Sequence, residues 1–188
     1  MLEFEDFEEK TIHRQELYHG KIIDVALDDV LLPSGETTKR ELVFHPGGVG
    51  LIALTDENKM VFVKQFRKPL ERVILEIPAG KIEAGETDPA ATGLRELEEE
   101  TGYRASSVEL ITSMYLSPGY ANERLYLYQA KGIQKVEHPL AQDEDEVIEV
   151  YELTLEEAKE AIKQDVICDA KSIYAVLYWE LQMEKGRI

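Results

Sequence analysis

The chain has 188 residues and a formal net charge of −17, from 38 acidic and 21 basic side chains. This length allows one domain with a real hydrophobic core, and the 44% of hydrophobic residues excludes a wholly disordered chain. So acidic a surface repels a phosphate backbone, and we therefore expect no nucleic-acid partner. A small anionic substrate stays possible where divalent cations lie between carboxylates and phosphates.

The sequence also predicts where the protein works. No apolar run approaches the roughly 20 residues that a membrane-spanning helix needs. The N-terminal stretch MLEFEDFEEK is acidic, whereas a secretory signal is basic and then apolar. The single cysteine, Cys168, cannot form an internal disulfide, which agrees with a reducing compartment. These features predict a cytoplasmic protein without membrane contact.

The first part of the chain alternates extended segments with turns. Strands are predicted at 11–18, 21–32, 37–44, 49–55, 60–66 and 73–77. Pro33-Ser34-Gly35 supplies one turn, because proline presets φ and glycine tolerates positive φ. The apolar segments 49–55 and 60–66 are joined by a short polar turn and predict a β-hairpin. The last strand ends at Pro78-Ala79-Gly80.

The second part of the chain carries helices among further strands. The first helix has Asp88 as its N-cap and Pro89 at its first position, and it runs to about Thr101, where Gly102 stops it. Further strands are predicted at 108–116, 124–130 and 147–153, and further helices at 155–164 and about 170–184. Many strands with a few helices between them favour an α+β fold with a largely antiparallel sheet.

The first predicted helix concentrates carboxylates on one face. Glu96, Glu99 and Glu100 stand at helical spacings of three and four, so they repel each other, and they lie near the C-terminal end, where the helix dipole disfavours anions. A divalent cation reverses the sign of this energy, because carboxylate oxygens are the ligands that Mg²⁺ prefers. The glutamates alone fit a solvated acidic face equally well. Arg95, four residues before Glu99, and Glu86, in a glycine-marked loop, favour the metal site.

The stretch from Gly80 to Gly102 resembles the sequence box of the Nudix family, G-x5-E-x7-R-E-U-x-E-E-x-G-U, where U is aliphatic. Two positions depart from it: eight residues instead of seven separate Glu86 from Arg95, and Tyr103 replaces the final aliphatic residue. We expect the extra residue ahead of the helix, where it leaves the register of the carboxylates unchanged. The matching residues are Gly80, Glu86, Arg95, Glu96, Leu97, Glu99, Glu100 and Gly102.

The resemblance extends over the whole chain and is closest to the ADP-ribose pyrophosphatase branch of that family. The stretch 75–80 is similar to the one that leads into the box in that branch, and Pro118 stands sixteen residues after Gly102, as a proline of the branch does. The resemblance implies an α+β Nudix fold over residues 47–188, a mixed, largely antiparallel sheet sandwiched by helices. It also implies that residues 1–46 form an N-terminal β segment that helps to form a homodimer and part of the substrate site.

The resemblance further implies a metal site and a reaction. The direct ligands would be the carbonyl of Ala79 and the carboxylates of Glu96 and Glu100, with Glu99 close by or sharing a metal. The metal would be Mg²⁺, with Mn²⁺ as a possible substitute. The reaction would cleave the pyrophosphate of ADP-ribose into AMP and ribose 5-phosphate. The box residues implied to shape this site are Gly80, Glu86, Arg95 and Gly102.

The resemblance places the general base in the acidic loop 142–146. By itself such a loop is most often a solvated charge run. In the similar enzymes a catalytic glutamate lies here, directly before a strand, which selects Glu146, with Glu144 in reserve. A glutamate of the box, such as Glu99, has this role in some members of the family.

Four further residues are implied to bind the substrate. Arg67 ends an apolar strand with no carboxylate in local reach, and it would contact the diphosphate or the terminal ribose through its planar fork of donors. Glu41 would accept a hydrogen bond from the adenine amino group, and Ile22 would pack on the base. Pro118 marks preference for ADP-ribose.

Other functions compete with this hypothesis. The box specifies the reaction and not the group attached to the nucleotide, so hydrolysis of GDP-mannose, NADH or dinucleoside polyphosphates is an alternative. A module that senses ADP-ribose without cleaving it is another alternative. Such modules usually lose box carboxylates, whereas Glu96, Glu99 and Glu100 are all present here.

Overall fold

The computed structural model describes residues 7–83, 85–142 and 147–187, which fall into two compact units. The N-terminal unit is Met1–Gly47 with Tyr115–Arg124, and the larger unit is Gly48–Met114 with Leu125–Ile188. The expected boundary between residues 46 and 47 lies beside this division. The segment Tyr115–Arg124 joins the N-terminal unit, which the sequence had not indicated.

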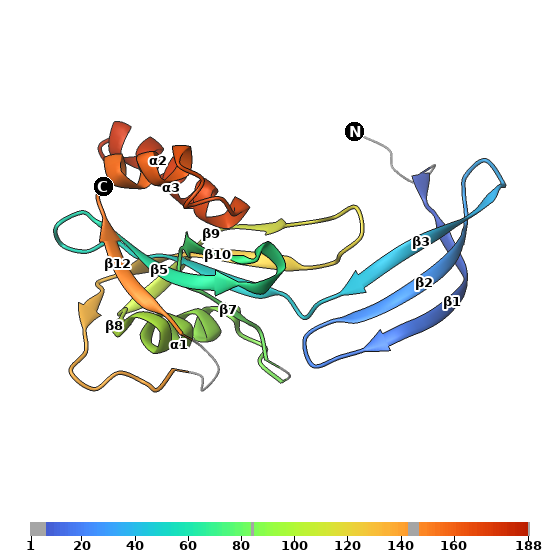
Figure 1. The fold of residues 1–188 in the computed structure, drawn as a ribbon, viewed down its shortest axis with the longest axis horizontal. Helices are drawn as coiled ribbons and strands as arrows, with labels where there is room; N and C mark the ends of the chain where they lie inside the picture. Colours follow the sequence, from blue (N-terminus) through green and yellow to red (C-terminus); the bar gives the residue numbers. More distant parts are fainter. Residues whose placement is uncertain (1–6, 84, 143–146, 188) are drawn as a thin grey trace. The chain divides into compact units, whose positions relative to one another are not determined.

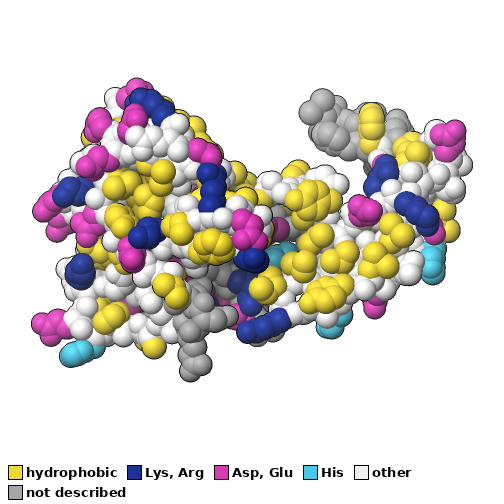
Figure 2. All heavy atoms as spheres, viewed as in Figure 1, with side chains coloured by type: hydrophobic (Ala, Val, Ile, Leu, Met, Phe, Trp, Pro, Cys, Tyr) yellow, Lys and Arg dark blue, Asp and Glu magenta, His cyan; other side chains and the backbone are white. Residues whose placement is uncertain are grey.

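The N-terminal unit is built on a three-stranded antiparallel sheet. Its strands are β1 (Lys10–His19), β2 (Asp24–Leu31) and β3 (Thr37–Phe44), drawn in blue in Figure 1. Alternate residues of β2 are buried, as the two-residue period of a strand requires. One of them is Asp28, whose carboxylate accepts hydrogen bonds from Arg14 Nε at 2.8 Å and Nη2 at 2.7 Å. Figure 2 shows apolar side chains gathered over this sheet.

The larger unit combines three small sheets. A four-stranded sheet has the order β7 (Ala79–Lys81), β4 (Gly48–Ile52), β10 (Arg124–Lys131), β9 (Ser107–Tyr115). A three-stranded antiparallel sheet has the order β12 (Glu149–Leu153), β5 (Met60–Arg67), β6 (Arg72–Glu76). The short strands β8 (Tyr103–Arg104) and β11 (Gln134–Lys135) form a pair. Since β4 is parallel to β10 and antiparallel to β7, the first sheet is mixed, as expected.

Helices cover both faces of the larger unit (Figure 1). They are α1 (Pro89–Thr101), α2 (Leu155–Lys163) and α3 (Ala170–Glu184), with the short 3-10 helix η2 (Lys68–Leu70). Leu97 of α1 belongs to one apolar core, and Trp179 of α3 belongs to the other. Neighbouring residues of one strand reach opposite cores: in β5, Val61 lies in the core of α1 and Phe62 in the core of α2 and α3. The sandwich of helices around mixed sheets confirms the predicted α+β fold.

The prediction that segments 49–55 and 60–66 pair with each other as a β-hairpin is wrong. The turn forms, with the Thr55 N–H donating to the Lys59 carbonyl at 2.8 Å, and Leu54 and Met60 make a single bridge. Beyond it, β4 pairs with β7 and β10, whereas β5 pairs with β6 and β12. β4 and the first half of β5 are buried on both faces, which suits strands that have a neighbour on each side. Strands β7, β8 and β11 are too short to show a pattern and were missed.

In the part of the chain that the structure describes, we find no helix of the length and apolarity that crossing a membrane demands.

We expect Phe62→Ala to lower the free energy of unfolding by about 3–5 kcal/mol, because a fully buried ring is replaced by a cavity. Phe66→Ala is the matched control on the same strand, since Phe66 is 51% exposed and its loss should cost less than about 1 kcal/mol. Urea unfolding followed by circular dichroism measures both values. Equal losses in the two variants would contradict the assignment of this core.

Candidate active site

Helix α1 begins and ends where the sequence predicts. The Asp88 side chain caps it by accepting a hydrogen bond from the Ala90 N–H at 3.0 Å, and Pro89 takes the first helical position. Gly102 ends the helix with a φ of 68°, and its N–H donates to the Glu98 carbonyl at 2.9 Å. Because these bounds hold, the box glutamates keep their helical register.

One arginine orients three of the predicted carboxylates. Arg95 Nη1 lies 2.6 Å from Glu99 Oε2, and Arg95 Nη2 lies 2.9 Å from Glu96 Oε1 and 3.4 Å from Glu86 Oε1. Burial alone would lower the pKa of the Arg95 guanidinium, but the charges of Glu96 and Glu99 outweigh it and hold that pKa above its ordinary value. The guanidinium therefore stays charged and offsets the repulsion among these carboxylates.

The backbone of Ala79 and Gly80 lies directly against the carboxylates of α1. The Ala79 N–H donates a hydrogen bond to Glu100 Oε2 at 2.9 Å, and Glu100 is buried. A Cβ at Gly80 would lie 1.9 Å from Cδ of Glu96, so any larger residue here would displace that carboxylate. This segment is β7, which pairs with β4 in the register Val49 to Gly80.

The loop before α1 holds Glu86 in a defined position. Glu86 Oε2 accepts hydrogen bonds from the Glu83 N–H at 2.8 Å and from Thr92 Oγ1 at 3.0 Å. The backbone hydrogen bond from Glu83 lowers the pKa of the Glu86 carboxyl, and the Thr92 hydroxyl and the Arg95 charge act in the same direction. The eight-residue spacing therefore does not prevent Glu86 from reaching Arg95.

Glu98, the variable position inside the box, is a buried carboxylate whose role the sequence did not indicate. Its two oxygens each lie 2.8 Å from a nitrogen of Arg104, and Oε1 also accepts a hydrogen bond from the Leu140 N–H at 3.3 Å. These hydrogen bonds from Arg104 lower the pKa of the Glu98 carboxyl. No sequence signal indicated the pair, since a spacing of six residues makes neighbours on neither a helix nor a strand.

Glu146, the predicted general base, and Glu144, the second candidate, lie outside the described residues. Before them, the Gln142 side chain donates a hydrogen bond to the Glu100 carbonyl at 3.4 Å. After them, β12 pairs with β5. The last described residue before this segment, Gln142, therefore contacts α1, the helix that carries the box.

Arg67 has a partner that the sequence did not reveal. It ends β5, and its Nε donates a hydrogen bond to Oε2 of Glu76 on the neighbouring strand β6, at 2.5 Å. The sequence indicated no carboxylate in local reach, and Glu76 is nine residues away along the chain. The strand register pairs Arg67 with Arg72 and Glu76 with Val63, so the long Arg67 side chain reaches along the sheet to Glu76. The Arg67 side chain is 40% exposed, so it still faces solvent.

The remaining predicted substrate residues all belong to the N-terminal unit. Glu41 lies exposed on β3, and Ile22 lies exposed in the turn between β1 and β2. Pro118 is exposed in a turn that β3 holds, because the Val43 N–H donates to the Tyr120 carbonyl at 2.8 Å. Glu41 and Pro118 thus stand on neighbouring segments of the same unit.

The donor set fits a hard divalent cation in kind. The carboxylates of Glu96, Glu99 and Glu100 and the carbonyl of Ala79 offer oxygen ligands only. Across residues 7–83, 85–142 and 147–187, no three acidic, histidine or cysteine side chains converge on one point. Instead Arg95 holds Glu96 and Glu99, while the Ala79 N–H holds Glu100. The structure brings together Ala79, Gly80, Glu86, Arg95, Glu96, Glu99 and Glu100, and Gly102 ends the helix that carries them.

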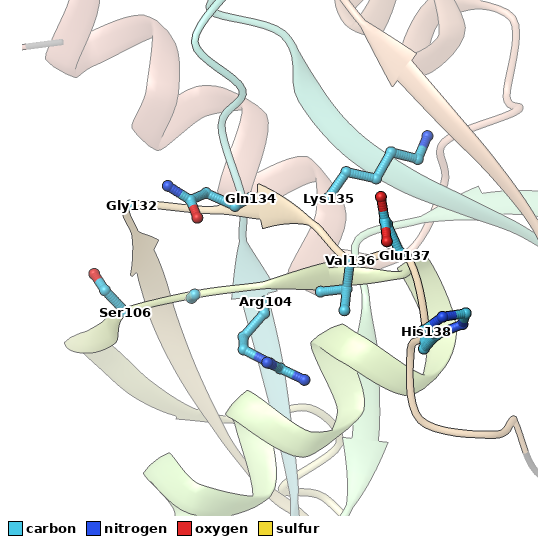
Figure 3. A pocket seen from close by; sticks show the side chains of 9 residues that line it. Arg104, Ser106, Gly132, Gln134, Lys135, Val136, Glu137 and His138 are labelled. Carbon is cyan, nitrogen blue, oxygen red and sulfur yellow. The ribbon is translucent and has the colours of Figure 1, made fainter.

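A shallow depression of about 560 Å³ is lined by residues of β8 and β11 and by the residues next to these strands (Figure 3). Its lining includes Arg104, Lys135 and His138, which are cationic or titratable. Arg104 is already paired with Glu98, and Lys135 lies over the ring of Tyr103, 5.5 Å from its centre. None of the predicted site residues lines this depression, so we assign the chemistry to the acidic face of α1.

Comparison with known proteins agrees with this geometry. Residues 44–175 match the NUDIX domain. The chain is 53% identical to a methanol dehydrogenase activator of Bacillus methanolicus, over 94% of this chain and 95% of that protein. It is 50% identical to an ADP-ribose pyrophosphatase of Bacillus subtilis (strain 168), over 93% of this chain and 94% of that protein. Its fold is similar to that in a crystal structure of an ADP compounds hydrolase, with a TM-score of 0.82 and 18% identity over 96% of this chain and 97% of that chain. The chain therefore belongs to the Nudix family, as its box predicted.

Proposed function

We propose that this protein hydrolyses the pyrophosphate bond of ADP-ribose to AMP and ribose 5-phosphate in a reaction that requires a divalent metal. The observation that carries this proposal is the acidic face of α1, where Glu96 and Glu100 lie against the backbone of Ala79 and Gly80. The 50% identical relative named an ADP-ribose pyrophosphatase supports the choice of substrate. Carboxylates that only face solvent would not require backbone groups this close to them, as Ala79 and Gly80 are here.

The proposed ligands of Mg²⁺ are the Ala79 carbonyl and the carboxylates of Glu96 and Glu100, with Glu99 close by, and Mn²⁺ is a proposed substitute. When bound, the metal neutralises phosphate oxygens and lowers the pKa of a bound water. The chain holds these oxygens on one face through Arg95 and the Ala79 N–H, so little reorganisation is needed at the moment of reaction.

The attacking water must lose a proton, and we propose Glu146 as the carboxylate that accepts it. Glu144 is the second choice, and Glu99 on α1 is the third. A glutamate in this loop suits the role because the described residue before the loop, Gln142, already contacts the box helix.

We propose that Arg67 binds the diphosphate or the terminal ribose of the substrate. A guanidinium presents a planar fork of donors that matches phosphate oxygens. On the N-terminal unit, Glu41 is proposed to accept a hydrogen bond from the adenine amino group and Ile22 to pack on the base. Pro118 is proposed to shape the same subsite. GDP-mannose and NADH are the alternative substrates.

We propose that the protein acts as a homodimer whose N-terminal segments complete each other's substrate sites. Every residue of β1 is exposed in the single chain, and Ile12, Leu17 and Tyr18 expose apolar side chains there. Sedimentation equilibrium should give twice the chain mass of 21.4 kDa, and a monomer at micromolar concentration would contradict this.

We also propose a cytoplasmic location. A reducing cytoplasm suits the single Cys168, which cannot form an internal disulfide.

Activation of a methanol dehydrogenase is a second candidate function, because a relative with that name is 53% identical. Methanol oxidation by such a dehydrogenase should be measured with and without this protein, and with its Glu100→Gln variant. If the native protein activates the dehydrogenase and the Glu100→Gln variant does not, the activation is a consequence of hydrolysis. Activation by neither would remove this candidate.

The proposed substrate is tested by a panel of ADP-ribose, NADH, GDP-mannose and diadenosine polyphosphates, with Mg²⁺ and with EDTA, and with identification of the products. We expect AMP and ribose 5-phosphate from ADP-ribose as the preferred reaction, lost with EDTA. Preferred cleavage of another member would keep the metal site and replace the substrate. Tight binding of ADP-ribose without any cleavage would favour the sensing alternative instead.

We expect Glu100→Gln to lower kcat by on the order of a hundredfold or more, because an amide is a weak, neutral ligand for a metal. The amide oxygen still accepts the hydrogen bond of the Ala79 N–H, so the fold and the melting temperature should change little. Glu184→Gln, on the exposed end of α3, is the control that changes the same charge away from the site. Native kcat in Glu100→Gln at saturating Mg²⁺ would overturn the ligand assignment.

We expect Glu146→Gln to lower kcat by about 10²–10⁴-fold, the usual contribution of a general base, while the affinity for ADP-ribose stays near that of the native protein. Single-turnover kinetics and equilibrium binding in the same buffer separate the two effects. A native rate in this variant would move the base to Glu144 or Glu99, whose glutamine variants are then the next measurement.

A further inference from the structure

Four charged side chains outside the box meet where β5, β6 and α3 come together: Arg67, Glu76, Asp169 and Lys171. The side chains of Glu76 and Lys171 are 5% and 10% exposed, so both charges are buried. Lys171 Nζ lies 2.6 Å from Glu76 Oε1 and 2.9 Å from Asp169 Oδ1. Arg67 Nε lies 2.5 Å from Glu76 Oε2. Each oxygen of Glu76 therefore has a cation of its own.

The backbone fixes Glu76 from both sides. The Leu75 N–H donates to the Val166 carbonyl at 2.9 Å, and the Ile77 N–H donates to Ser172 Oγ at 2.9 Å. Ser172 stands in the first turn of α3, which Asp169 caps by accepting a hydrogen bond from the Ser172 N–H at 3.1 Å. The start of α3 therefore sets the position of the Glu76 carboxylate.

Arg67 differs from two other arginines of the chain in how it meets its carboxylate. Arg104 contacts both oxygens of Glu98 through Nε and Nη2, and Arg14 contacts both oxygens of Asp28 in the same way. Arg67 contacts one oxygen of Glu76, through Nε only. The other oxygen is the one that Lys171 occupies.

This difference leaves the outer edge of Arg67 available to a ligand. Among the described residues, none accepts a hydrogen bond from its Nη1 or Nη2, and its side chain is 40% exposed. A guanidinium held through Nε presents its terminal donors as a fixed fork, which is the geometry that binds two phosphate oxygens. Holding it in advance lowers the entropy cost of binding.

We propose that Lys171 is a positioning residue that acts through Glu76 to keep the two terminal nitrogens of Arg67 free for the diphosphate of the substrate, an inference that rests on the proposed function. A buried carboxylate with Arg67 as its only cation would draw the guanidinium into a two-point pair, as Asp28 and Glu98 do with theirs. Lys171 opposes this because it places a second positive charge on Oε1, so the Glu76 charge is compensated without a second contact from Arg67. It also keeps the buried charge of Glu76 compensated while the terminal nitrogens of Arg67 bind an anion.

The first test is the kinetics of Lys171→Met. We expect KM for ADP-ribose to rise about tenfold and kcat to change less than about threefold, because the loss falls on binding by Arg67. Lys171→Arg, which keeps the charge, should restore KM to within about threefold of the native value. Lys159→Met is the control, since Lys159 of α2 forms an ion pair with Glu180 of α3, the helix that carries Lys171, and is not among the contacts of Glu76. Its KM should stay native.

A double-mutant cycle separates positioning from a general structural role. Arg67→Lys lacks the fork that Lys171 is proposed to hold, so adding Lys171→Met to it should raise KM by less than about twofold more. A tenfold rise in both backgrounds would show that Lys171 does not act through Arg67 and would overturn the inference. Where Lys171→Met does not fold, Glu76→Gln tests the same link and should be equally non-additive with Arg67→Lys.

Failure of the proposed function is recognised separately. If the native protein does not cleave ADP-ribose, that function falls, and the same cycle is measured with ADP as the probe by calorimetry without metal. We then expect ADP to bind about tenfold more weakly to Lys171→Met than to the native protein, with no further loss in the Arg67→Lys background. Additive losses, or no binding of ADP to the native protein, would overturn the inference.

Discussion

Like charges crowded on one face of a helix are the constraint on which this site depends. Glu96, Glu99 and Glu100 stand in the last two turns of α1, where their mutual repulsion and the helix dipole both oppose them. Arg95 contacts Glu86, Glu96 and Glu99 together, and its partial burial strengthens each of these interactions. The arginine of the box is therefore as necessary to the arrangement as the carboxylates themselves.

The position of this acidic face depends in turn on one strand. β4 pairs with β7, which brings Ala79 and Gly80 into place, and α1 packs on the same strand. A Cβ on Gly93 of α1 would come within 3.2 Å of Leu51 Cδ1, so the helix lies close to the strand. Because one strand positions both parts, the distance between the Ala79 backbone and Glu100 is set by a packed core and not by a loop.

Local rules explain what could be predicted from the sequence. Asp88, Pro89 and Gly102 each act on the backbone within a turn of α1, so the helix bounds followed from residue types alone. The hairpin prediction failed because a turn determines only a local reversal, whereas strand partners are chosen across the fold. The contact between Ala79 and Glu100, 21 residues apart, was accessible through family resemblance and not through spacing. The contact between Lys171 and Glu76, 95 residues apart, had no signal of either kind.

The chain treats its carboxylates in two different ways, and burial decides between them. On α1, partly exposed carboxylates share Arg95, because water screens the remaining repulsion and leaves their oxygens within reach of a ligand. Beneath Arg67, the buried Glu76 has a cation on each oxygen, because an uncompensated charge there is far more costly. The first arrangement is suited to attracting a cation, and the second leaves an arginine edge suited to an anion. Binding of a metal-bound diphosphate would use both a cation site and an anion site. The net charge of −17 alone does not indicate the second of these.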